Sequence, residues 1–281
     1  MKIIECPRDA IQGIIPFIPT ENKARYINEL LRAGFDTIDF GSFVSSKAIP
    51  QLTDTAEVLK KLDLSGSTKL LAIVANERGA LEACAFDEIT YLGFPFSISE
   101  TFQKRNTRAS ITESVERVKT ISKLCHKYGK KLVIYISMGF GNPYGDEWSA
   151  ITVMKWVNTL SRLRINIFSI ADTVGIATPE NINYLFGYLR PAYPNLEFGA
   201  HFHTDGNDWR AKVSVAYAHG IRRFDTAILG FGGCPMAGNE LVGNLPTDKL
   251  LQFLEEKRVE TGLKRDTITH LEQSFKQLIS S

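Results

Sequence analysis

The stretch "SITESVERVKTISKLCHKYG" (residues 110–129), followed at once by "KLVIYIS" (131–137), decides the fold. Apolar residues in the first segment recur at helical spacing, and the segment closes on a glycine suited to a helix C-terminus. The second segment is a short run rich in β-branched and aromatic residues, which is typical of a buried strand. Together they predict a helix that leads directly into a strand.

The same alternation of short apolar runs and longer amphipathic segments fills the chain. Strand-like runs lie at residues 2–5, 37–42, 69–75, 88–94, 131–137, 166–172, 197–203 and 222–229. Among the intervening helical segments, 20–34 begins at a cap-like Thr20 and ends in a glycine, and 178–189 begins with Thr, Pro and Glu. Eight βα units with nearly continuous apolar strands predict an α/β fold, a (β/α)8 TIM barrel.

We expect residues 1–281 to form a single barrel domain, in which the segment after residue 262 adds a C-terminal helix. An open, doubly wound sheet is the alternative architecture. It is less favoured, because no glycine-rich dinucleotide loop follows the first strand.

Composition places the protein among ordinary globular proteins and argues against several partners. The chain has 44% hydrophobic and 23% charged residues with a net charge of +2, which does not favour nucleic-acid binding. The basic stretch "KRNTR" (104–108) is a candidate anion site. No apolar run approaches the roughly 20 residues that a membrane span requires.

The ends and the cysteines predict a cytoplasmic location. The opening "MKIIECPRDA" enters a strand-like run at once, so we expect no signal or transit peptide. Cys6, Cys84, Cys125 and Cys234 are widely spaced and form no CxxC pair. A disulfide framework or zinc ribbon is therefore not expected. We expect a reducing compartment instead.

Polar residues stand where the predicted strands end, at the face where barrel enzymes carry their active sites. They are Arg8, Asp9, Asp39, Ser42, Ser137, Asp172, His201 and His203, with Cys234 and Asn244 in the loop after the last strand. They come from distant parts of the chain, and closing the barrel brings them to one mouth.

The histidines of "HFH" (201–203) are two residues apart, so both rings face the same side of a strand. By itself such a pair is more typical of packing than of metal binding. Asp9 and Asn244 at matching strand ends change that interpretation, because two imidazoles, a carboxylate and an amide oxygen suit Mg²⁺, Mn²⁺, Co²⁺ or Zn²⁺. We therefore predict a divalent-metal site.

The other polar residues at the mouth could have structural roles instead of catalytic ones. Arg8 and Asp9 could form an ion pair that closes a loop, Asp172 could cap the following helix, and Asp39 could pair with a lysine. Cys234 could be a buried structural thiol. Its segment, residues 230–244, is rich in glycine and has no periodicity, which favours a mobile loop and a catalytic thiol.

The chain resembles the 3-hydroxy-3-methylglutaryl-CoA lyase family, metal-dependent barrels related to isopropylmalate and homocitrate synthases. The resemblance covers nearly the whole chain through "ECPRDAIQ" (5–12), "SFVSSKAIPQ" (42–51), "FQKRN" (102–106), "GNPYGD" (141–146), "ADTVGIATP" (171–179), "HFH" (201–203), "GFGGCPMA" (230–237) and "GNLPTDKL" (243–250). It implies cleavage of the acyl-CoA to acetyl-CoA and acetoacetate, with Mg²⁺ or Mn²⁺ as the metal, and a homodimer.

The resemblance also implies roles for individual residues. Metal ligands would be Asp9, His201, His203 and Asn244. Arg8 would face the thioester carbonyl, Asp39 stands where the family has a catalytic glutamate, and Asp172 would lie near the substrate hydroxyl. His201 or Asp172 would accept the hydroxyl proton, and Cys234 would transfer a proton to the enolate. Ser42 and Ser137 would line the acyl pocket.

The chain departs from the family pattern in several places, including the segment "GIIPFIP" (13–19), which replaces polar residues. Ala10 replaces a glycine, Asp39 shortens a glutamate, Ala171 replaces the glycine of a "GDT" motif, and Thr204–Asp205 reverses the usual Asp-Thr order. These departures keep open a related metal-dependent aldolase or Claisen-type synthase acting on another hydroxy acyl-CoA or 2-oxo acid. A metal-binding barrel without turnover is a third hypothesis, which the presence of Arg8 and Cys234 disfavours.

Overall fold

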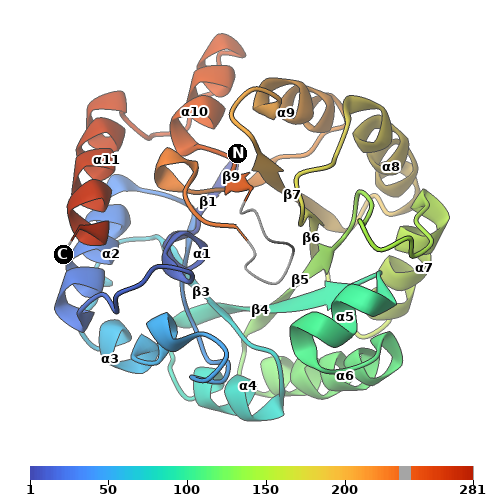
Figure 1. Ribbon diagram of the computed structural model, residues 1–281, viewed down its shortest axis with the longest axis horizontal. Coiled ribbons are helices and arrows are strands. Elements are labelled where there is room, and N and C mark those ends of the chain that lie inside the picture. The colour runs from blue at the N-terminus through green and yellow to red at the C-terminus, as the bar shows by residue number, and fades with distance from the viewer. Residues whose placement is uncertain (234–241, 281) are drawn as a thin grey trace.

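Parallel strands alternate with helices and close into a barrel in the computed structural model, which describes residues 1–233 and 242–280 (Figure 1). The strands are β1 (Lys2–Glu5), β2 (Thr37–Ser42), β3 (Lys69–Ile73), β4 (Ile89–Ser97), β5 (Lys131–Ser137), β6 (Ile167–Asp172), β7 (Glu197–Thr204) and β8 (Arg223–Thr226). Each pairs in parallel with its neighbours, and β8 returns to β1. The predicted (β/α)8 barrel is confirmed.

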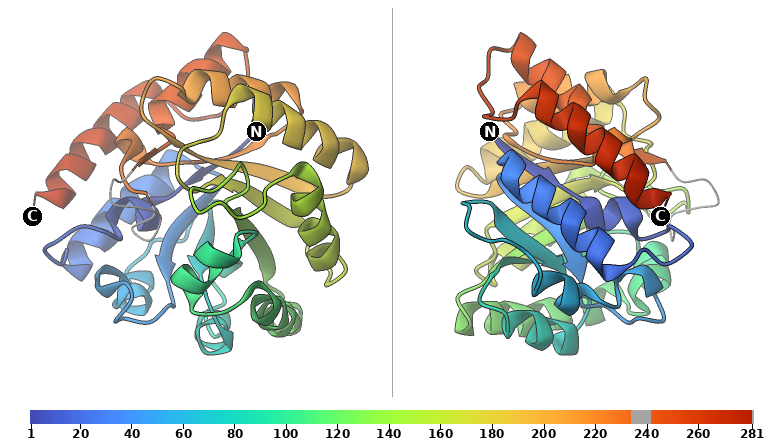
Figure 2. Two further views of the ribbon diagram at one scale, coloured as in Figure 1. Left: turned by 45° about the vertical axis from the view of Figure 1, so that its right-hand side comes forward. Right: turned by 90° about the vertical axis from the view of Figure 1, so that its left-hand side faces the viewer.

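Most of the helices form a ring outside the strands, and the first, α1 (Pro7–Ile11), lies inside that ring at the mouth (Figure 1). The others are α2 (Thr20–Ala33), α3 (Thr55–Leu59), α4 (Glu77–Cys84), α5 (Glu100–Thr107), α6 (Ile111–Lys127), α7 (Ala150–Ser161), α8 (Pro179–Ala192), α9 (Trp209–Ala218), α10 (Thr247–Glu256) and α11 (Arg265–Ile279), with 3-10 turns η1 (Pro50–Leu52) and η2 (Ile228–Gly230). The predicted C-terminal helix is α11. It lies against α2 (Figure 2), where the rings of Tyr26 and Phe275 are 5.5 Å apart.

Local sequence signals explain where several helices begin and end. At the start of α6, Ser110 and Glu113 form a reciprocal capping box, and α2 stops at Gly34, whose φ of 94° suits glycine. The interpretation of Thr20 as a cap is wrong. Pro19 occupies the cap position, and the Thr20 hydroxyl instead donates to Asp54 Oδ2 at 2.7 Å.

Two short elements at the mouth were not predicted. The five residues of α1 follow β1 directly and carry both Arg8 and Asp9. The two-residue strand β9 (Gly243–Asn244) pairs antiparallel with β7, which places Asn244 opposite His203. Both elements add polar side chains at the carboxyl ends of the barrel strands.

Apolar side chains fill the space between the strands and the helices, and a smaller group fills the barrel interior. The interior group consists of Leu71, Ile73, Tyr91, Val133, Tyr135 and Ile167. This packing supports the strand ends from below and fixes the side chains that project into the mouth. None of the helices in the described ranges is long and apolar enough to cross a membrane.

Candidate metal centre and its cavity

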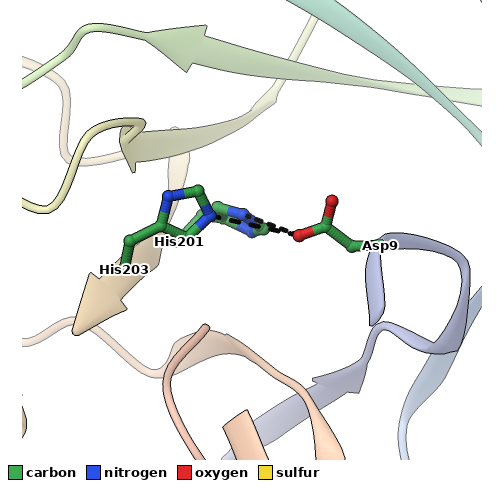
Figure 3. A group of neighbouring side chains, drawn as sticks. All are labelled: Asp9, His201 and His203. Carbon is green, nitrogen blue, oxygen red and sulfur yellow. Dashed lines mark ion pairs between the residues drawn. The ribbon is translucent and has the colours of Figure 1, made fainter. Parts of the chain in front are cut away.

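Asp9, His201 and His203 converge at the mouth of the barrel (Figure 3). Asp9 comes from α1, and the histidines come from neighbouring inward positions of β7. Asp9 Oδ2 lies 3.8 Å from His201 Nε2 and 4.0 Å from His203 Nε2. All three residues are buried, and each offers a ligand atom within 4.8 Å of the other two. This separation leaves room for a cation between them.

Each imidazole is held from behind by its other nitrogen. His201 Nδ1 lies 3.1 Å from Asp225 Oδ2, and His203 Nδ1 lies 2.9 Å from the carbonyl oxygen of Thr173. These acceptors direct each Nε2 atom toward Asp9, an arrangement typical of metal-binding histidines. His203 Nε2 is buried and has no hydrogen-bond partner among the residues that the structure describes. A buried polar atom left in this way fits a missing metal partner.

The surroundings of Asp9 and His203 favour the forms that bind a cation, whereas those of His201 favour its protonated form, whose proton a cation must displace. Burial, followed by the charge of His201, lowers the pKa of His203 to about 4, so its ring is neutral at neutral pH. Burial would raise the pKa of Asp9, but Arg8 and the histidines lower it below its ordinary value. Burial would lower the pKa of His201, but the hydrogen bond and charge of Asp225 raise it. The site thus combines an ionised carboxylate with a neutral imidazole.

Asn244 joins this group from β9. Its Nδ2 donates to Asp9 Oδ2 and to the carbonyl oxygen of Phe231, both at 2.8 Å. The predicted fourth ligand therefore contacts Asp9 directly and stands opposite His203 in the register of β9 and β7. With its oxygen, the donor set of one carboxylate, two imidazoles and one amide fits a divalent cation with open positions.

Arg8 and Asp39 form a buried pair beside the metal centre. Arg8 Nη2 and Nε both donate to Asp39 Oδ2, at 2.6 and 3.0 Å, while Nη1 donates to Asp9 at 3.0 Å and to Gln12 at 3.2 Å. Burial raises the pKa of Asp39 to about 6, against the opposing charge of Arg8. Asp39 thus pairs with an arginine rather than with a lysine.

A cavity of about 670 Å³ opens over this centre. Its described lining includes Arg8, Asp9, Ser42, Tyr135, Ser137, Thr173, His201 and His203. Both predicted pocket serines are therefore present. The lining also includes the exposed cationic residues Lys47, Arg105 and Arg108, two of which belong to the predicted anion site at 104–108.

The structure places Asp172 apart from the described lining of the cavity. Its Oδ2 accepts from Lys212 Nζ at 2.8 Å, and its Oδ1 accepts from the backbone of Ala177 at 3.0 Å. The Lys212 ammonium also donates to the carbonyl oxygens of His203 and Gly175. Asp172 therefore braces the loop behind the metal centre. Cys234 lies outside the described residues.

Sequence reasoning missed two residues that support the site. Asp225 lies within the predicted strand 222–229 and supports His201. An acidic residue inside an apolar run was the sequence signal that could have identified it. Lys212 lies on α9 and its side chain is 1% exposed. Its pair with Asp208, four residues earlier, is a local signal, but its partners Asp172 and His203 come from strands β6 and β7, and no local pattern marks them.

The fold and the site together define a class of protein. It is a parallel barrel with a candidate divalent-metal centre, made of a carboxylate and two imidazoles, at the carboxyl ends of its strands. A family model described as HMGL-like matches residues 2–274, nearly the entire chain. The protein therefore belongs to the HMGL-like family.

Relatives and solved structures agree with this assignment. Hydroxymethylglutaryl-CoA lyase YngG of Bacillus subtilis is 31% identical over 265 residues, which cover 93% of this chain and 87% of the relative. A 3-hydroxy-3-isohexenylglutaryl-CoA/hydroxy-methylglutaryl-CoA lyase of Pseudomonas aeruginosa is 28% identical, with 94% and 87% covered. The structure of an HMG-CoA lyase from Acinetobacter baumannii with coenzyme A and 3-methylmalate is 29% identical, with 100% and 91% covered and a TM-score of 0.93.

Proposed function

We propose that this protein is a divalent-metal-dependent carbon–carbon lyase that cleaves 3-hydroxy-3-methylglutaryl-CoA to acetyl-CoA and acetoacetate. The observation that carries the proposal is the meeting of Asp9, His201 and His203 with Arg8 in one cavity, in a chain of the HMGL-like family. The donor atoms are nitrogen and oxygen, which supports Mg²⁺ or Mn²⁺, with Zn²⁺ or Co²⁺ as alternatives.

The reaction removes a proton from a tertiary alcohol and places negative charge on a thioester oxygen. A bound divalent cation supplies Lewis-acid polarisation of the substrate's oxygen atoms. Arg8 supplies the countercharge for the thioester oxygen. Arg8 donates four hydrogen bonds to Asp39, Asp9 and Gln12, so one of the five guanidinium hydrogens remains for the substrate.

Asp39 and Asp172 act through neighbours in this proposal. Asp39 fixes the plane of the Arg8 guanidinium, and Asp172 fixes Lys212 and the loop that carries Thr173. Ser42 and Ser137 line the acyl part of the cavity. Cys234 remains the proposed donor of the proton that converts the enolate to acetyl-CoA.

The two roles proposed for His201 compete for one atom. A single lone pair on Nε2 either binds a cation or accepts a proton. Asp225 stands behind the ring, as is usual for metal-bound imidazoles, and Nε2 faces Asp9. We therefore assign Nε2 to the cation in the metal-loaded protein.

The proposed substrate carries a coenzyme A group, and the exposed cationic part of the cavity lining suits its phosphates. Lys47, Arg105 and Arg108 supply positive charge there. We also propose a single barrel domain, a homodimer and a cytoplasmic location. The described cysteines, Cys6, Cys84 and Cys125, are all free, which supports a reducing compartment.

The proposal is tested by incubating the purified protein with 3-hydroxy-3-methylglutaryl-CoA, a thiol reductant and, in turn, Mg²⁺, Mn²⁺, Zn²⁺ or Co²⁺. We expect acetoacetate with at least one metal and none with the Asp9→Asn variant, which loses the ionised ligand. The absence of acetoacetate with every metal contradicts the proposed activity.

The alternative, a related aldolase or Claisen-type synthase, is separated by a substrate panel. Acetyl-CoA with a series of 2-oxo acids, followed by release of free coenzyme A, detects synthase activity. Hydroxyglutaryl-CoA esters with longer substituents at C3 detect a lyase of different acyl preference. Turnover of a panel member in the absence of 3-hydroxy-3-methylglutaryl-CoA cleavage supports the alternative.

A further inference from the structure

The two metal-centre histidines differ in the group that supports them. His203 Nδ1 meets a neutral backbone carbonyl at 2.9 Å, whereas His201 Nδ1 meets the carboxylate of Asp225 at 3.1 Å. His201 and Asp225 are direct partners in the register of β7 and β8. The carboxylate therefore lies on the wall of the barrel, beneath the metal centre, and not on a loop.

Asp225 is a buried carboxylate with few of the contacts that usually stabilise one. It is 2% exposed, and its Oδ2 accepts from Ser169 Oγ at 3.0 Å in addition to the contact with His201. Its Oδ1 has no hydrogen-bond partner within the described part of the chain. Burying such a group costs free energy unless it is compensated, which points to a role other than stability.

A compensating cation stands on the same face of β8. Arg223 precedes Asp225 by two residues, so both side chains project into the barrel. Arg223 is 1% exposed, and its guanidinium nitrogens have no hydrogen-bond acceptor among the described residues. Its Nη1 forms a longer ion pair with Glu197 Oε1 at 3.5 Å. Burial would lower the pKa of Arg223, but the nearby charge of Asp225, ahead of that of Glu197, raises it, so Arg223 balances this carboxylate only in part.

We propose that Asp225 is a positioning residue, which holds His201 as the Nδ1–H tautomer and aims its Nε2 at the metal centre. This inference rests on the metal site of the proposed function. An imidazole that donates through Nδ1 presents its lone pair on Nε2, and a carboxylate acceptor increases the electron density of the ring. The strand-to-strand register fixes the ring plane, so the ligand is in place before the cation arrives.

The test is the affinity of the metal-stripped protein for Mn²⁺, measured by calorimetry without substrate. In Asp225→Ala we expect the Kd for Mn²⁺ to rise by about 10- to 100-fold, the range for loss of a supporting carboxylate. Asp225→Asn keeps an acceptor oxygen for Nδ1–H but removes the charge, so a smaller rise, of several-fold, is expected. Ser169→Ala removes a hydrogen bond to the same carboxylate without touching His201, and its Kd should stay within about twofold of wild type.

The outcomes separate this inference from the metal site itself. Wild-type Kd values in folded Asp225→Ala and Asp225→Asn overturn it, as does a rise in Ser169→Ala equal to that in Asp225→Ala. If Asp225→Ala does not fold, the Kd of Asp225→Asn decides in the same way. Failure of the wild-type protein to bind Mn²⁺ any better than Asp9→Asn overturns the metal site and the positioning role together.

Discussion

Arg8 Nε and Nη2 both donate to the same oxygen of Asp39, at 3.0 and 2.6 Å, although the two residues belong to α1 and β2. Asp39 is fully buried, so this contact immobilises the guanidinium against the wall of the barrel. Arg8 consequently faces the cavity in one orientation, beside the metal centre. Preorganised positive charge of this kind stabilises charge that develops in a transition state.

Replacing Arg8 should therefore affect turnover more than metal binding. In Arg8→Met we expect kcat to fall by about 10²- to 10³-fold, the usual cost of losing one such donor. The Kd for Mn²⁺ should change little, because Asp9, His201 and His203 remain. Arg8→Lys keeps the charge but loses the forked contact with Asp39, so it should also lose most activity. Undiminished turnover in Arg8→Met removes this residue from the mechanism.

Binding of a cation should stabilise the folded protein. Mn²⁺ at about 100 times its Kd should raise the free energy of unfolding by about 2.7 kcal/mol, because the unfolded chain lacks the assembled site. His203→Ala removes one ligand and should abolish most of this gain. Urea denaturation with and without Mn²⁺ measures the effect. An equal gain in wild type and His203→Ala places the cation elsewhere.

Glu5 should make stability depend on pH. Burial raises the pKa of Glu5 to about 7 from an ordinary 4.5, despite hydrogen bonds from Thr247, Ile228 and Thr226. Between these values the folded state binds more protons than the unfolded state, so the free energy of unfolding falls as pH rises through this window. The fall attributable to this carboxyl is of the order of 3 kcal/mol and is complete above the higher value.

Glu5→Gln is the matched variant, because its amide can donate to the hydroxyls of Thr226 and Thr247 and still accept from Ile228. Relative to wild type, Glu5→Gln should become progressively more stable from about pH 4.5 to about pH 7. Urea denaturation of both proteins at several pH values measures the difference. Parallel pH profiles contradict the prediction.

The buried ion pair of Lys212 and Asp172 should be essential to the fold around the metal centre. Both side chains are 1% exposed, so Lys212→Met leaves an uncompensated carboxylate and should lower the free energy of unfolding by about 3–5 kcal/mol. Adding Asp172→Asn should recover part of this loss. Lys60 in its exposed pair with Glu57 provides the control, since Lys60→Met should cost less than about 1 kcal/mol. Equal losses in both lysine variants refute the structural role.

Sequence patterns predicted the elements that are long or strongly periodic. The runs predicted at 2–5, 37–42 and 131–137 coincide with β1, β2 and β5, and the apolar residues within them are buried. The period of two in a strand placed His201 and His203 on one face before the partners were known. Barrel closure then brought Asp9 and Asn244 to them.

The remainder depends on tertiary contacts that no local pattern records. The helix α1 has five residues, too few for a helical period, and β9 has two. Asp172 was interpreted from its place at a strand end, but its direction is set by Lys212, a residue of α9. A long side chain on a distant helix decides which way this carboxylate points.

The most direct test of the account is a titration of metal-stripped protein with Mn²⁺ while cleavage of 3-hydroxy-3-methylglutaryl-CoA is followed. The account predicts no turnover without metal and a rise to a plateau at one Mn²⁺ per chain, with acetoacetate and acetyl-CoA in equal amounts. Turnover that is unchanged by removing and restoring the metal, or saturation of the site without any acetoacetate, would contradict it.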